Sequence, residues 1–142
     1  MKKKIIKNQD NLPKFIIGIS SQSYDFQVVW SINSIIEKTL TKTKSLILKF
    51  KKDDNKEEIF EFSLFSYSDL DENKLYLLSN KDGGVYLYPK YKNIDYFFII
   101  KSNELFIDDI LKKITGEKFI LGSFLIPVNN YLKKIINNVS SI

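Results

Sequence analysis

The chain has 142 residues, of which 44% are hydrophobic and 27% are charged, a composition that is typical of one globular domain and excludes a disordered chain. Cysteine and histidine are absent, so disulfides, thiolate metal sites and histidine-dependent catalytic triads are excluded. The formal net charge is +5 and every basic residue is lysine, a bias that AT-rich codons explain without a nucleic-acid partner.

Residues 1–13 begin like a signal peptide, with three lysines and two isoleucines after Met1. Polar residues then interrupt the apolar run that such a peptide needs. We therefore expect residues 1–13 to form a flexible basic tail and residues 14–142 to form a single domain. The longest apolar runs are too short to span a bilayer, so a cytoplasmic protein without a membrane partner is expected.

The first predicted elements are a buried strand over residues 15–19 and a helix that follows it. Ser21 or Ser23 is predicted to cap this helix, which runs to about Leu40. Its apolar positions cover more than half of the helical wheel: Phe26, Val28, Val29, Trp30, Ile32, Ile35, Ile36 and Leu40. The remaining polar stripe consists of Gln27, Ser31, Ser34 and Lys38. A helix this apolar is predicted to lie between two layers or at a subunit contact.

Three strand-like segments follow, over residues 46–51, 58–67 and 74–79. The short polar connections between them predict antiparallel hairpins. In the middle segment apolar residues alternate with polar ones, so one face is predicted to be drier than the other. Gly83-Gly84 predicts a turn that opens a loop through Lys92, and residues 94–100 predict a strand buried on both faces.

The last third of the chain predicts a helix, a strand and a terminal helix. The helix covers residues 104–115, with Ser102 or Asn103 as its cap and Gly116 at its end. Its predicted core face consists of Phe106, Ile107, Ile110, Leu111 and Ile114. The strand over residues 119–126 ends at Pro127, and residues 128–139 form the last helix. This order predicts an α+β fold, loosely ferredoxin-like: a largely antiparallel sheet, two main helices packed on it and a short C-terminal helix.

The stretch from Tyr88 to Tyr96 is the strongest candidate site, because it joins an X-Pro turn to an apolar strand and places an acid beside a tyrosine. The candidate binding residues of this signature loop are Tyr88, Pro89, Lys90, Tyr91, Lys92, Asp95 and Tyr96. Asp95 could orient Tyr96 or a nearby lysine for proton transfer. An aspartate that enters a strand also commonly accepts N–H bonds from the preceding loop, so a structural role stays open.

The signature loop resembles the motif that defines the IPExxxVDY proteins, a bacterial family. Pro89, Asp95 and Tyr96 match the motif, and Ile94 replaces its valine. Lys90 stands where the family has glutamate, which reverses the charge, and Tyr88 replaces isoleucine. Upstream similarities follow in the same order over residues 18–20, 25–33, 78–81 and 83–84. The resemblance implies a single-domain architecture, without a reaction or a ligand.

A second candidate lies on the first predicted helix, where Phe26, Trp30 and Asn33 share a face. In one interpretation Trp30 anchors the core and Asn33 binds a nearby loop. In the other, this face lines a partner groove together with the signature loop, because rigid aromatic residues are typical of interface centres.

These features favour a non-catalytic protein-binding or regulatory module that recognises a protein partner or a second copy of the chain. No metal, cofactor or catalytic residue is expected, because histidine and cysteine are missing and the chain has neither a phosphate-binding glycine motif nor a complete calcium loop. RNA binding is an alternative, because the signature loop alternates tyrosines that could stack on bases with lysines that could meet phosphates. An enzyme of unknown type that uses Asp95 and Tyr96 is a second alternative.

Overall fold

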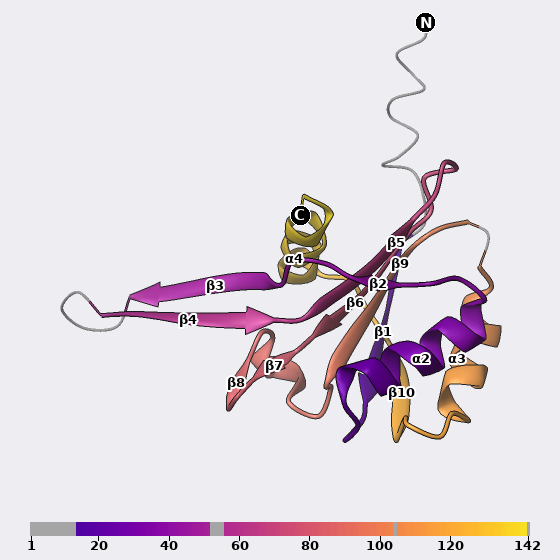
Figure 1. Ribbon diagram of the computed structural model, residues 1–142, viewed down its shortest axis with the longest axis horizontal. Coiled ribbons are helices and arrows are strands. Elements are labelled where there is room, and N and C mark those ends of the chain that lie inside the picture. The colour runs from indigo at the N-terminus through magenta and orange to yellow at the C-terminus, as the bar shows by residue number, and fades with distance from the viewer. Residues whose placement is uncertain (1–13, 52–55, 104, 142) are drawn as a thin grey trace, which may run out of the picture.

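A six-stranded antiparallel sheet forms the centre of the molecule, with the strand order β10-β1-β9-β6-β5-β2 (Figure 1). The computed structural model describes residues 14–51, 56–103 and 105–141, so the predicted tail over residues 1–13 lies outside the described residues. The strands of this sheet are β1 (Lys14–Ser20), β2 (Thr41–Lys42), β5 (Leu64–Ser68), β6 (Lys74–Ser79), β9 (Tyr96–Lys101) and β10 (Gly122–Ile126). Two further hairpins pair β3 (Leu46–Lys51) with β4 (Glu57–Phe62) and β7 (Lys81–Asp82) with β8 (Val85–Tyr86). The helices are α2 (Asp25–Ile36), α3 (Ile107–Thr115) and α4 (Asn130–Ser140), and a short 3₁₀ turn covers Pro89–Tyr91.

Four adjacent strands of the sheet have the arrangement of a ferredoxin-like fold. In chain order these strands are β1, β6, β9 and β10. Across the sheet they lie in the order β10, β1, β9, β6, which is fourth, first, third and second in the chain. Helix α2 lies in the connection from β1 to β6, and α3 lies in the connection from β9 to β10. Each connection skips one antiparallel strand, as a split βαβ unit does. The predicted α+β class is therefore confirmed, and β5 and β2 extend the sheet beyond β6.

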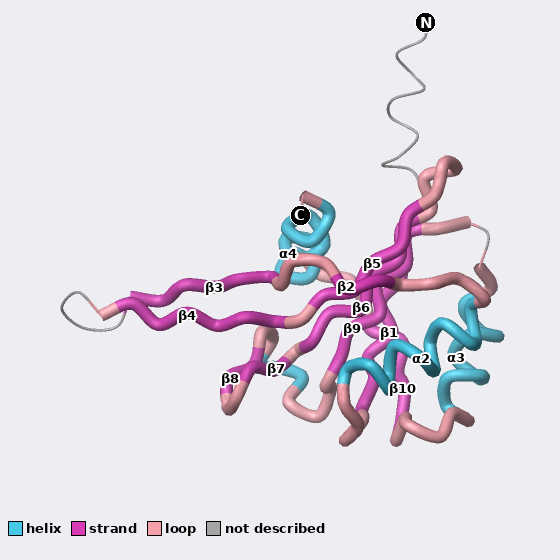
Figure 2. The backbone as a smooth tube through the Cα atoms, in the orientation of Figure 1, coloured by secondary structure: helices cyan, strands magenta, loops and turns pink. Residues whose placement is uncertain are grey.

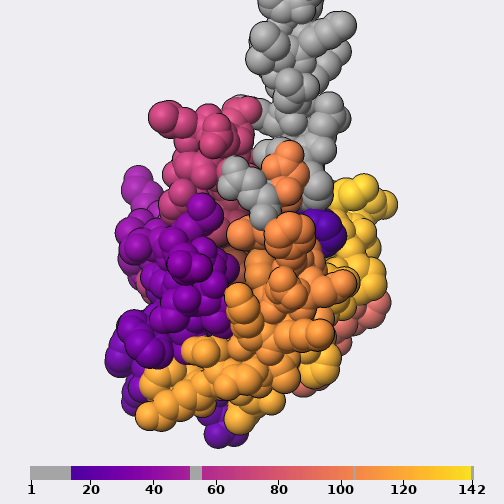
Figure 3. All heavy atoms as spheres, turned by 90° about the vertical axis from the view of Figure 1, so that its right-hand side faces the viewer, coloured from indigo at the N-terminus to yellow at the C-terminus, as the bar shows by residue number. Residues whose placement is uncertain are grey.

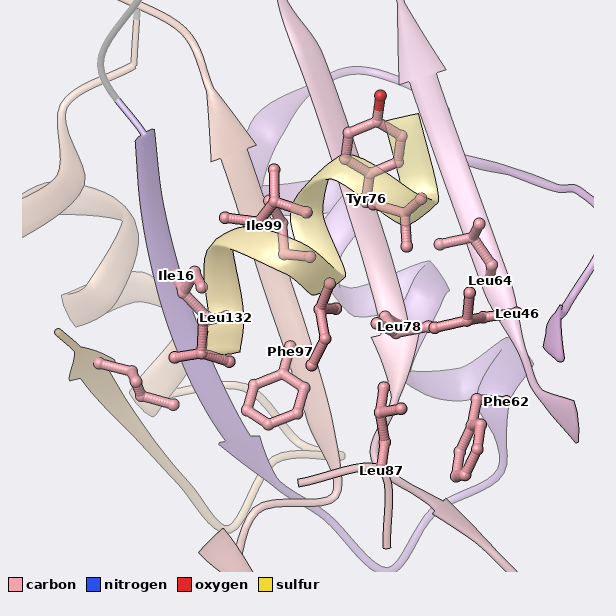
Figure 4. Packing of buried hydrophobic residues seen from close by; sticks show 14 of the residues in the cluster. Ile16, Leu46, Phe62, Leu64, Tyr76, Leu78, Leu87, Phe97, Ile99 and Leu132 are labelled. Carbon is pink, nitrogen blue, oxygen red and sulfur yellow. The ribbon is translucent and has the colours of Figure 1, made fainter. Parts of the chain in front are cut away.

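Helices cover both faces of the sheet (Figure 2). On one face the core joins α2 and α3 to the strands through Ile17, Val28, Ile32, Phe98, Ile110 and Ile114. On the other face α4 and the β3–β4 hairpin pack on the sheet through Leu46, Phe62, Tyr76, Phe97, Ile99 and Leu132 (Figure 4). The central strands are thus buried on both sides, which explains why the sequence of β9 is an almost continuous apolar run.

Helix α2 begins later than predicted, and neither predicted serine caps it. It begins at Asp25, where the Tyr24 N–H donates to Gln27 Oε1 at 3.0 Å and closes the first turn. The two serines bond to each other instead, with the Ser23 N–H donating to Ser21 Oγ at 3.0 Å. The predicted caps were wrong because both hydroxyl groups lie in the connection before the helix.

Helix α2 also ends earlier than predicted, at Ile36. Glu37 adopts a left-handed conformation with φ of 56°, which ends the helix, and the Leu40 N–H donates to Asn33 Oδ1 at 3.0 Å. The predicted polar stripe is partly wrong, because Ser31 is fully buried and its hydroxyl has no hydrogen-bond partner among the described residues.

Helix α3 begins at Ile107, and Ser102 does not cap it. Ser102 Oγ donates to Asn73 Oδ1 at 2.8 Å, and both residues are buried, so this serine joins the end of β9 to the residue before β6. Asn103 is exposed, and Glu104, the predicted first residue of the helix, lies outside the described residues.

The core face of α3 is narrower than predicted. Ile110 and Ile114 are buried, but Phe106 is 77% exposed because it precedes the helix. The helix ends before Gly116, as predicted. Two predicted strands also differ: the segment over residues 58–67 divides at Ser63 into β4 and β5, and the last strand begins at Gly122. The division lets β4 leave the sheet with β3 as a projecting hairpin (Figure 1).

Candidate functional site

The signature loop between β8 and β9 is held by one buried side chain, that of Asn80. Its Nδ2 donates to the carbonyl oxygens of Tyr91 at 3.0 Å and Ile94 at 2.9 Å, and its Oδ1 accepts the Tyr88 N–H at 2.8 Å. Asn80 is fully buried, so these bonds form away from water. Asn80 was not among the predicted site residues, because an asparagine just before Gly83-Gly84 looks like an ordinary turn residue.

Asp95 connects the signature loop to the segment before α2. Its Oδ2 accepts the Ser21 N–H at 2.8 Å, and its Oδ1 pairs with Lys81 Nζ at 2.6 Å. The hydrogen bond from the ammonium to Asp95 raises the pKa of Lys81 above its ordinary value. The amide that Asp95 binds therefore belongs to a residue 74 positions earlier in the chain, and not to the loop that precedes it.

Tyr96 is buried at the start of β9 and acts as a hydrogen-bond donor. Its hydroxyl donates to Asp25 Oδ1 at 2.6 Å, across 71 residues of sequence. Burial and, after it, the hydrogen bond to Asp25 raise the pKa of Tyr96 well above its ordinary value. This tyrosine therefore keeps its proton near neutral pH, which suits it to orient Asp25 and not to act as a base.

A shallow polar pocket of about 300 Å³ lies between these two networks. Its walls include Ser21, Ser23, Asp25, Ser79, Lys81, Asp95 and Tyr96. The geometry brings Asp95 and Tyr96 of the signature loop together with Asp25 of α2. Because Asp95 and Tyr96 already bond to protein groups, neither of them is placed in this pocket as a free nucleophile or base.

Tyr88 and Tyr91 of the signature loop lie on the opposite face of the sheet, beside α4. Tyr88 contacts Tyr91 edge-to-face at 5.2 Å between ring centroids and Tyr131 at 4.6 Å. The Tyr88 hydroxyl accepts a bond from Asn129 Nδ2 at 2.7 Å. Lys90 Nζ lies 5.7 Å from the centre of the Tyr91 ring. These rings therefore dock the loop onto α4, which leaves less of their faces for bases to stack on.

Trp30 and Phe26 are exposed on α2 and form a surface of their own. They are 61% and 67% exposed, so the interpretation of Trp30 as a core anchor was wrong. Trp30 contacts Phe119 edge-to-face at 6.3 Å, and Tyr24 stacks on Phe26 at 5.8 Å. We call Tyr24, Phe26, Trp30 and Phe119 the aromatic patch. Asn33 binds the Leu40 N–H and lies outside this patch.

The aromatic patch surrounds an apolar hollow of about 440 Å³, lined by Phe26, Gln27, Trp30, Lys118 and Phe119. Figure 3 views the molecule from this side, where the purple residues of α2 adjoin the orange residues that lead into β10. The predicted groove between Trp30 and the signature loop is not formed, because no residue of that loop lines the hollow, and Tyr88 and Tyr91 lie on the opposite face of the sheet. Phe119 supplies the second wall, and the sequence pattern missed it because the segment before β10 reads as a strand.

The described residues contain no group of three or more acidic, histidine or cysteine side chains placed to hold a metal ion. Within the same residues, no helix is both long enough and apolar enough to cross a bilayer. Comparison of the chain with protein-family models, curated proteins and solved structures gives no match. The resemblance to the IPExxxVDY proteins therefore stays a prediction from the sequence.

Proposed function

We propose that the protein is a non-catalytic binding module that recognises another protein through the aromatic patch. One observation carries this proposal: Tyr24, Phe26 and Trp30 are 74%, 67% and 61% exposed, although the core under α2 is filled by other buried residues, most of them aliphatic. Clustered exposed aromatic residues are typical of interface centres, where they become buried on binding.

The chemistry of the patch indicates the kind of partner. The hollow between Trp30 and Phe119 has room for one or two apolar side chains. Lys118 lies at its margin, and its Nζ is 5.5 Å from the centre of the Phe119 ring. The partner we propose therefore presents an apolar anchor beside a carboxylate, which would be attracted to Lys118 and to a chain of net charge +5.

The contacts of the signature loop favour binding over catalysis. Asp95 is occupied by Ser21 and Lys81, and Tyr96 is a neutral donor to Asp25. The loop therefore supports the position of α2, on which the patch lies. We extend the proposal to membership of the IPExxxVDY family, which the signature residues support, and to a cytoplasmic location, which the absence of cysteine supports.

The test is capture of partners from native lysate by the tagged protein, with and without nuclease. Wild type and the control Leu70→Ala, which changes a fully exposed leucine in the turn before β6, should recover the same discrete protein in both arms. Trp30→Ala should weaken binding of that protein by about thirtyfold, or ~2 kcal/mol, because it removes a central aromatic anchor.

Two outcomes would contradict the proposal. Equal binding of the partner by wild type and Trp30→Ala would move the interface elsewhere. Partners that disappear after nuclease treatment would favour the RNA alternative, and binding should then fall steeply with salt.

A further inference from the structure

The two edges of the six-stranded sheet differ. One edge is β2, which has only two residues and carries Lys42. The other edge is β10, with five uncharged residues, Gly-Ser-Phe-Leu-Ile, and no described strand pairs with its outer side. Monomeric proteins usually protect a sheet edge with short strands, charges, prolines or bulges. The edge at β2 has such protection, and the edge at β10 has none within the strand.

Both faces of β10 also expose apolar side chains at this edge. Leu125 pairs with Ile17 of β1 and is 50% exposed, whereas Phe124 pairs with Gly18 and is 49% exposed. Ile17 belongs to the core under α2 and α3, so Leu125 and Phe124 point to opposite sides of the sheet. A strand added beside β10 would cover part of both side chains.

The helix above this edge carries a matching pattern of charge. Thr115 Oγ1 and Ser123 Oγ lie 2.7 Å apart, which fixes the flank of α3 that contains Thr115 above β10. At 3.6 residues per turn, Asp108 and Lys112 lie on this same flank, and both are exposed. If α3 of a second copy ran antiparallel beside this one, Asp108 of each copy would lie opposite Lys112 of the other.

We infer that β10 pairs antiparallel with β10 of a second copy of the chain, which gives a homodimer with one continuous sheet. A twofold axis near Phe124 sets only uncharged residues of β10 against each other, so the strand meets no like charge. The same axis brings the two α3 flanks together with opposite charges facing. Two copies of a chain of net charge +5 repel each other overall. These two features would offset that repulsion at the contact, and they therefore favour a second copy over an unrelated strand. This contact does not use the aromatic patch, so it goes beyond the proposed function.

The oligomeric state of the purified chain tests the inference, measured by sedimentation equilibrium over a range of concentrations. Wild type should form a reversible dimer of the 16.7 kDa chain. Phe124→Lys places two lysines near the axis and should weaken the dimer by about tenfold or more. The control Leu70→Lys adds the same charge at a fully exposed turn and should leave the dimer unchanged. A wild-type monomer at every concentration would overturn the inference, as would a Phe124→Lys dimer of unchanged stability.

A mixing experiment separates the contact from effects on folding. Asp108→Lys should weaken the dimer, because the introduced lysine would face Lys112 of the second copy, and Lys112→Asp should weaken it through two facing aspartates. An equimolar mixture of the two variants should restore dimers, because every facing pair is then opposite in charge. A mixture that remains monomeric, with both variants folded by circular dichroism, would overturn the twofold arrangement.

Discussion

Asn80 shows how one side chain can fix a loop that has little regular structure. It satisfies three backbone groups of the signature loop and also accepts the Leu87 N–H on its own carbonyl oxygen at 2.7 Å. Each of these groups would otherwise be poorly solvated under the loop. The position of Tyr88 and Tyr91 against α4 therefore depends on the buried side-chain amide of Asn80.

Replacement of Asn80 by alanine should destabilise the fold by about 2–4 kcal/mol, because two carbonyl oxygens and one N–H lose their partners in a buried place. Urea unfolding followed by circular dichroism measures this change. Asn93→Ala, in the same loop but exposed, is the matched control and should change stability by less than about 0.5 kcal/mol. Equal effects of the two substitutions would show that Asn80 does not hold the loop.

At the scale of single elements, β1 depends on a glycine at its centre. A Cβ on Gly18 would lie 2.5 Å from Ile126 Cδ1 and 2.8 Å from Ile94 Cδ1. Both isoleucines are buried, so neither can move away without disturbing the core. Gly18 thus lets Ile94, the last residue of the signature loop before Asp95, pack directly against β1.

Gly18→Ala should therefore destabilise the protein by about 1–3 kcal/mol, the usual cost of overpacking. The double variant Gly18→Ala with Ile126→Val removes the nearest methyl group and should be less destabilised than the sum of the two single changes. A double-mutant cycle from urea unfolding curves measures the coupling. Strict additivity would show that the methyl group of Ile126 does not oppose the new side chain.

The elements differ in how well the sequence predicts them. The apolar runs of β1, β6 and β9 and the periodicity of α4 are local signals, and the structure has these elements close to their predicted positions. The caps of α2 and α3 were wrong, because Ser21 and Ser102 bond to Phe119 and Asn73, which are remote in sequence. The pattern also did not show which apolar residues of α2 are exposed, since apolar positions cover more than half of its helical wheel.

The candidate site was harder to predict than the fold, because its contacts join distant segments. The sequence placed Asp95 beside Tyr96, but their partners Ser21 and Asp25 lie more than 70 residues earlier. The aromatic patch needs contact between Trp30, in the connection from β1 to β6, and Phe119, in the connection from β9 to β10. Such pairs follow from strand order, and strand order is not a local property.

At the scale of the whole molecule, three groups with raised pKa values make stability depend on alkaline pH: Tyr96, Lys81 and Tyr131, whose pKa is raised by burial. Their folded-state pKa values lie above the ordinary values of 10.0 for tyrosine and 10.5 for lysine. The folded state therefore holds these protons more tightly than the unfolded state does. Their contribution is fully present below about pH 10 and is lost as the pH rises through the folded-state values.

The midpoint of urea unfolding should accordingly stay nearly constant from pH 7 to about pH 9 and fall above about pH 10. Tyr96→Phe should flatten this fall, because phenylalanine does not titrate and only Lys81 and the other groups remain. Tyr24→Phe, at an exposed tyrosine, should keep the wild-type profile and serves as the control. An identical alkaline profile for wild type and Tyr96→Phe would contradict the assignment.

The position of β1 between β9 and β10 has a consequence for synthesis on the ribosome. Ser21 meets Asp95 only after another 74 residues have been added, and β10 is made later still. At roughly 5–20 residues per second, that interval is about 4–15 s, during which neither neighbouring strand is present. The apolar β1 and α2 thus emerge with nothing to pair with, and the nascent chain, more than the finished protein, is the state in which chaperones would be needed.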